Sequence, residues 1–162
     1  TRGAQFATLR LRLMGDVLMR WILAILLFLL PATASTAWAE IGQIKLSFGQ
    51  ASLERKGELI PAKVGLLVEA ADVIITGKDG RLGITFTDDS RFAAGPNSRI
   101  ELTTFKFNAT THEGEFVTKV DQGTLAVVSG NIAKHRPDAM RVRTPSSVLG
   151  VRGTKFLVKV AP

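Results

Sequence analysis

Short apolar runs recur throughout residues 40–162, and each run closes on Gly, Asn, Asp or Pro. In Arg81–Phe86 the pattern alternates, with Leu82, Ile84 and Phe86 on one side and Arg, Gly and Thr on the other. Such alternation is typical of a half-buried β-strand. Turn residues arrive roughly every ten residues, a spacing typical of all-β folds. We therefore expect an all-β domain of short strands, either β-solenoid-like or a two-layer β-sandwich.

Individual segments add detail to this prediction. The Lys56-Gly57 pair predicts a tight turn between the two arms of a hairpin. Asp72–Thr76 predicts a buried strand, because its residues are mostly β-branched and apolar. Thr124–Val128 is apolar on both faces, which indicates a strand that is central or covered.

The pattern leaves one segment in which a helical turn could form. In Ser129–Met140, Ser129 or Asn131 could cap one helical turn, but Pro137 limits its length. We expect a loop there, and a second loop at residues 108–114, where polar residues and Gly114 interrupt the apolar runs.

The first 39 residues differ from the rest. They carry four Arg and one Asp, then the ten-residue apolar run Trp21–Leu30, then Pro31 and an A-x-A site at Ala37–Ala39. This order predicts a secretory signal peptide with a helical apolar core, starting at Met14, Met19 or further upstream. An uncleaved anchor is the alternative, because the alanine-rich tail could lengthen the run. Both readings place residues 40–162 in the periplasm or elsewhere in the cell envelope.

Charge and cysteine content exclude some classes. The whole chain has a net charge of +7, of which residues 1–39 carry +3 and residues 40–162 carry +4, from 17 basic and 13 acidic residues. That mild excess lacks the dense basic stripe of a nucleic-acid-binding protein. The chain has no cysteine, so the domain must hold its fold with its core alone.

The segment Val148–Val160 poses a problem of register. Alternation places Phe156, Val158 and Val160 toward the core, and the same register extended backward buries Arg152. A bulge at Gly153 could turn the side chain outward. We favour the other solution, in which the guanidinium is held inside by a carboxylate and by backbone carbonyl groups. The candidate partners are Asp72, Asp89, Glu101 and Asp121.

The same segment resembles a known family. The run TPSSVLGVRGTKFLV, Thr144 to Val158, is similar to the signature of FecR domains, which end in a T-P…A-V-R-G-T-x-F-x-V pattern. The resemblance extends over about residues 41–160. Two positions depart from it: Asp89 and Ala71 stand where the family usually has Gly. The matching motif positions are Asp72, Thr76, Asp88 and Ser90, and the structural signature consists of Thr144, Pro145, Gly150, Arg152, Gly153, Thr154 and Phe156.

The resemblance implies a role in the envelope. FecR proteins of the best-known type carry a cytoplasmic segment that regulates an extracytoplasmic-function sigma factor in iron-uptake signalling, then a membrane helix and an outer sensing domain. In this sequence residues 1–20 precede the apolar run. We therefore expect a stand-alone exported FecR-domain protein, with the membrane-anchored sensor as the alternative.

Catalytic and metal-binding patterns are weak. His112 and His135 lie in polar loops, and Asp88 and Asp89 are neighbours on a turn, so neither pair predicts a metal site. Ser146 and Ser147 lack an adjacent His–acid pair. We expect a non-enzymatic module without cofactors that binds another envelope protein or a surface glycan, not nucleic acid. We expect membrane contact only through residues 21–39, if these are not cleaved.

Overall fold

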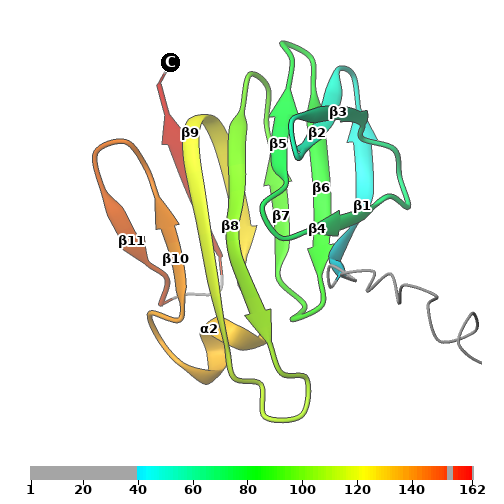
Figure 1. The fold of residues 1–162 in the computed structure, drawn as a ribbon. Helices are drawn as coiled ribbons and strands as arrows, with labels where there is room; N and C mark the ends of the chain where they lie inside the picture. Colours follow the sequence, from blue (N-terminus) through cyan, green and yellow to red (C-terminus); the bar gives the residue numbers. More distant parts are fainter. Residues whose placement is uncertain (1–39, 153–154, 162) are drawn as a thin grey trace, which may run out of the picture. The chain divides into compact units, whose positions relative to one another are not determined.

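The computed structural model describes residues 40–152 and 155–161. The predicted signal peptide at residues 1–39 lies outside the described residues. The described part consists of twelve strands and one short helix, so the prediction of an all-β domain is confirmed (Figure 1). The elements are β1 (Glu40–Phe48), β2 (Ala51–Arg55), β3 (Glu58–Pro61), β4 (Leu67–Glu69), β5 (Val73–Thr76), β6 (Arg81–Phe86), β7 (Arg91–Ala94), β8 (Arg99–Phe107), β9 (Gly114–Val128), α2 (Asn131–His135), β10 (Met140–Arg143), β11 (Val148–Gly150) and β12 (Lys155–Val160).

The strands form one curled sheet in the order β3-β2-β5-β8-β9-β7-β6-β1-β4. In addition, β10 and β12 pair with β9, and β11 pairs with β10. Strand β9 links two half-sheets. Its first half pairs with β8 and β10, and its second half pairs with β7 and β12. The change of partners falls at Gly123, whose φ of 92° is open to glycine and strained for other residues. We call the β8 side of this junction the first half-sheet and the β7 side the second half-sheet.

The core lies where the two half-sheets face each other. Phe86 and Phe92 of the second half-sheet pack on Phe116 of the first, with ring centroids 4.7 and 4.9 Å apart. Phe105 completes this aromatic cluster at 4.8 Å from Phe116. Aromatic pairs at these separations stabilise a core beyond the area they bury.

Neither of the two expected architectures describes this arrangement fully. Successive strands return antiparallel, and the one parallel pair, among those described, joins β9 and β10. A β-solenoid stacks its strands in parallel coils, so that alternative does not fit. The facing half-sheets resemble a two-layer sandwich, but the long strand β9 makes them one continuous sheet.

Local patterns were predicted well. Leu82, Ile84 and Phe86 are all buried, as the alternation in β6 indicated. Lys56 and Gly57 both have positive φ, 52° and 83°, as in the tight hairpin turns that match the twist of two strands. The second half of β9 is flanked by β7 and β12, so it is a central strand, as its sequence indicated.

The loop expected at residues 129–140 is wrong in part, because Asn131–His135 forms the helix α2. Its start is fixed by a distant residue: the main-chain carbonyl of Asp88 accepts a hydrogen bond from the Asn131 N–H at 2.7 Å. Capping from so far along the chain leaves no local signal in the sequence. No helix within the described ranges is long and apolar enough to cross a membrane.

Candidate functional site

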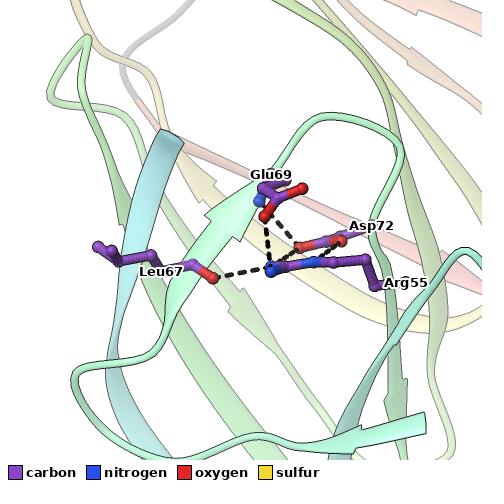
Figure 2. A network of polar contacts seen from close by, with 4 residues as sticks. All are labelled: Arg55, Leu67, Glu69 and Asp72. Carbon is purple, nitrogen blue, oxygen red and sulfur yellow. Dashed lines mark hydrogen bonds and ion pairs between the residues drawn. The ribbon is translucent and has the colours of Figure 1, made fainter. Parts of the chain in front are cut away.

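A nearly buried carboxylate at the start of β5 holds an arginine from β2 (Figure 2). The Nε of Arg55 donates to Oδ1 of Asp72 at 2.8 Å, and Nη2 donates to Oδ2 at 2.7 Å. The same guanidinium donates to Glu69 Oε1 at 2.7 Å and to the carbonyl oxygen of Leu67 at 2.9 Å. The side chain of Asp72 is 1% exposed and that of Arg55 is 20% exposed. The network therefore joins β2, β4 and the start of β5.

The geometry comes from the register between β2 and β5, which are antiparallel neighbours in the sheet. Glu54 of β2 pairs with Val73 of β5, so Arg55 and Asp72 come next on their respective strands. The hydrogen bonds to Asp72, with the negative charges of Asp72 and Glu69, raise the pKa of Arg55 above its ordinary value, although burial opposes this change. A two-pronged guanidinium–carboxylate contact suits a structural clamp, because it fixes both distance and orientation.

Asp88 forms a second buried polar centre in the turn between β6 and β7. Its carboxylate accepts hydrogen bonds from the Ser90 N–H at 3.0 Å and the Ser90 hydroxyl at 2.7 Å. The Ser90 hydroxyl in turn accepts a hydrogen bond from the N–H of Gly130 at 2.9 Å. Asp88 and Ser90 are both fully buried, so these groups tie the turn to α2 and are closed to a ligand.

The motif threonine is likewise used inside the fold. Thr76 donates its hydroxyl hydrogen to the carbonyl of Gly95 at 2.7 Å and accepts a hydrogen bond from the Ser98 N–H at 2.8 Å. It is 5% exposed. The four polar motif positions in the first part of the matched region therefore hold turns and strand ends together.

The prediction that Arg152 is buried is wrong. The side chain is exposed, and the neighbouring Val151 takes the inward position with 4% exposure. The N–H of Val151 donates to the carbonyl oxygen of Met140 at 2.9 Å, which fixes this orientation. The alternating register does not continue through this point, because β11 ends at Gly150 and β12 begins at Lys155.

The candidate carboxylate partners of Arg152 have other roles. Asp72 binds Arg55, Asp89 accepts a hydrogen bond from the Asn131 side chain at 2.9 Å, and Asp121 pairs with Lys119 at 2.8 Å. Glu101 lies half-buried in β8 beside Lys119 of β9. Across residues 40–152 and 155–161, no ion pair joins Arg152 to a carboxylate. The guanidinium is therefore open to solvent and to a binding partner.

The rest of the signature lies mainly at the surface. Thr144 closes a turn by accepting a hydrogen bond from the Ser147 N–H at 3.1 Å, and Pro145 beside it is exposed. Gly150 is the exposed last residue of β11, and Phe156 is half-buried against the core. Gly153 and Thr154 lie outside the described residues.

A hollow of about 510 Å³ lies between the loop that joins β8 to β9 and the end of α2. Its walls carry both signs of charge, from Lys106, Glu113 and Arg136 among others. His112 and His135 are both exposed, as expected for surface histidines. Within the described ranges, no group of three or more metal-ligating side chains comes together.

Arg55 was not predicted from the sequence. The one signal in the sequence was its position just before the Lys56-Gly57 turn, since its place beside Asp72 depends on the pairing of β2 with β5.

Comparison with known proteins gives one family match: the model described as FecR protein matches residues 72–162, more than half of the chain. No curated protein and no solved structure matches this chain. The matched region starts at the carboxylate that binds Arg55 and runs through the exposed signature.

Proposed function

The chain belongs to the FecR protein family, and on that premise we propose that residues 40–162 form a non-enzymatic binding module of the cell envelope. The module takes part in envelope signalling by docking another envelope protein. Its binding site is the exposed edge of β11 together with Arg152, which we call the signature edge. Export through the leader at residues 1–39 brings the module to the periplasm.

The proposal rests on which edge strands of the sheet are unpaired, exposed and apolar. Strand β11 pairs with β10 on one side, and no described strand lies on its other side. Its side chains are Val148, 62% exposed, and Leu149, 42% exposed. An apolar, unpaired edge strand is a template for another strand, and natural proteins protect such edges with charges or proline.

The other edge strands of the described sheet carry charges or proline. β3 carries Glu58 and Pro61, β4 carries Glu69, and β12 carries Lys155 and Lys159. β11 has neither a charge nor a proline. Strand addition at β11 would supply main-chain hydrogen bonds, and the exposed guanidinium of Arg152, two residues on, would pair with a carboxylate of the partner.

The polar chemistry of the domain favours binding over catalysis. The carboxylates and hydroxyls of the motif positions, from Asp72 to Ser90, are engaged in buried structural hydrogen bonds. Catalytic groups need access to a substrate and a partner that shifts their reactivity. We therefore propose that the module works without a cofactor, and that its partner is a protein. A surface glycan is the second choice, because strand addition requires a polypeptide.

A membrane-anchored sensor of the iron-uptake type is the second candidate function. The observation that favours it is the apolar run Trp21–Leu30 in a chain of the FecR family. The signature edge would serve this function equally, as the surface that receives the envelope signal. Determining the N-terminus of the protein from cells separates the two functions: a start near Glu40 favours the exported module, and a retained run favours the anchored sensor.

Affinity capture from the native envelope tests the binding function. We would compare the wild-type protein with the Val148→Lys/Leu149→Lys variant, which places charges on the signature edge. The matched control is Leu59→Lys, on the exposed face of edge strand β3, where Leu59 is 63% exposed. We expect the same envelope protein to co-purify with wild type and control and to be lost from the double variant. Equal recovery from all three, with folding intact, would exclude the signature edge as the binding site.

A further inference from the structure

We propose that the outer face of the second half-sheet binds the surface of an anionic lipid bilayer. This inference goes beyond the protein-binding function, and it relies on the proposed envelope location only for the choice of lipid as the occupant. We call this surface the basic face. It consists of the outward side chains of β6, β7, the second half of β9 and β12, namely Arg81, Arg91, Ala93, Ala126, Lys155, Leu157 and Lys159.

The basic face has charge of one sign. β6, β7, residues 123–128 of β9 and β12 together contain four basic residues and no acidic residue. All four basic side chains are exposed, and their strand neighbours Leu82, Phe92 and Val158 are buried. None of the four forms an ion pair with a described residue. Like charges held together without counter-ions attract an anionic surface.

The strand register brings these charges close together. Arg91 of β7 and Lys155 of β12 both pair with Val128 of β9, one from each side. Since neighbouring strands lie about 4.8 Å apart, the two residues start roughly 10 Å from each other. Lys159 lies farther along β12 beside Thr124, on the same outward side as Lys155.

An apolar row crosses the face between the charges. Leu46 pairs with Gly83, Gly83 with Ala93, Ala93 with Ala126, and Ala126 with Leu157, through five adjacent strands. Leu46 and Leu157 at the two ends are 52% and 64% exposed. The residues between them have small side chains or none, and a shallow hollow of about 400 Å³ lies over the β7–β9–β12 part of the row.

This combination fits a bilayer surface. Together with β1, which borders the basic face beside β6 and contributes Leu46, its strands at a spacing of about 4.8 Å span roughly 20 Å. Exposed leucines can enter the boundary between headgroups and acyl chains, while the flanking Lys and Arg side chains contact anionic headgroups. The inference differs from the sequence-based expectation that membrane contact is confined to residues 21–39.

The test is co-sedimentation of the protein recovered from cells with vesicles of phosphatidylcholine, with and without about one-third phosphatidylglycerol. The test variant is Arg91→Glu/Lys155→Glu. The matched control is Lys106→Glu/Lys134→Glu, which makes the same change in net charge at exposed residues of β8 and α2. Any contribution from residues 1–39 is the same in all samples. We expect affinity for the anionic vesicles to fall at least about tenfold in the test variant and clearly less in the control.

A leucine variant and a soluble polyanion distinguish a bilayer from an acidic protein as the partner. Leu157→Ser should weaken vesicle binding about threefold or more while leaving binding to soluble poly-glutamate unchanged, because only a bilayer receives the leucine. Equal losses in test and control variants, or equal binding to neutral and anionic vesicles, would overturn the proposal. Binding to poly-glutamate without binding to vesicles would overturn it too, and would assign the basic face to an acidic protein. None of these outcomes depends on whether the signature edge captures an envelope protein.

Discussion

Arg55 and Asp72 form a two-pronged ion pair, with Nε–Oδ1 and Nη2–Oδ2 distances of 2.8 and 2.7 Å, that joins the end of β2 to the start of β5. Asp72 is the first residue of the region that matches the FecR family. A buried carboxylate binds an arginine in this domain, as the sequence analysis expected, but the arginine is Arg55 and not Arg152. Arg152, in the signature, is exposed. The family motif therefore has a structural part in the interior and an accessible part at the surface.

Removing the carboxylate of Asp72 should destabilise the domain. In Asp72→Ala, the guanidinium of Arg55, which is 20% exposed, loses its main partner, and we expect the free energy of unfolding to fall by about 2–4 kcal/mol. The matched control is Asp121→Ala, which removes the ion pair between Asp121 and Lys119. The side chains of Asp121 and Lys119 are 32% and 47% exposed, so this pair should contribute less than about 1 kcal/mol to the free energy of unfolding. Urea unfolding measures both. Similar midpoints for the two variants would contradict a structural role for Asp72.

The contribution of Arg55 should not vary with pH in the ordinary range. Its pKa is raised in the folded state above its ordinary value, chiefly by hydrogen bonding to Asp72. A group with a raised pKa contributes stability in full below its unfolded-state pKa and loses it only as the pH rises through its folded-state pKa. We therefore expect the loss of stability in Arg55→Leu to be equal at pH 7 and pH 10. If Arg55→Leu destabilised the domain only half as much at pH 10 as at pH 7, this assignment would be contradicted.

Ala71 offers a stabilising substitution. Its φ of 68° lies in the left-handed region, which costs a residue with a Cβ about 1–2 kcal/mol. In Ala71→Gly this strain is relieved, and the greater freedom of glycine in the unfolded chain offsets part of the gain. We expect a net increase of about 0.5–1 kcal/mol in unfolding free energy. Ala109→Gly, in the loop after β8, should give no gain in chemical unfolding, and an equal gain in both variants would argue against strain at Ala71.

Local features could be predicted from the sequence because they depend on near neighbours. Alternation in β6 identified its buried side, and the polar turn residues located the turns. Asp89 stands in a turn in which the family usually has Gly. It adopts the left-handed conformation there, with a φ of 67°, which Asp tolerates better than most residues.

The errors have a common cause in long-range pairing. The residue that binds Asp72 depends on how β2 pairs with β5, and the position of α2 depends on hydrogen bonds that Asp88 accepts. The orientation of Arg152 was inferred by treating Val148–Val160 as one strand. That segment consists of two strands with different partners, β11 beside β10 and β12 beside β9, so a single register cannot hold through it.

Thr118 provides a test of the core. It lies in β9, is 1% exposed, and its hydroxyl has no hydrogen-bond partner among the described residues. A buried hydroxyl without a partner is costly, so Thr118→Val, which keeps the shape, should stabilise the domain by about 1 kcal/mol. Thr103→Val, at an exposed position of β8, should change stability by less than about 0.5 kcal/mol. Thermal unfolding compares the two, and destabilisation by Thr118→Val would mean that the hydroxyl is bonded after all.

The unfolding free energy of Arg152→Ala tests most directly whether the family motif is divided between interior and surface. An exposed side chain without an ion pair contributes little to stability, so urea unfolding should give a value within about 0.5 kcal/mol of the wild type. That result would leave the guanidinium available for recognition at the signature edge. A loss of more than about 2 kcal/mol would instead mean a buried and paired guanidinium, and would contradict the division of the motif into a structural interior and an accessible surface.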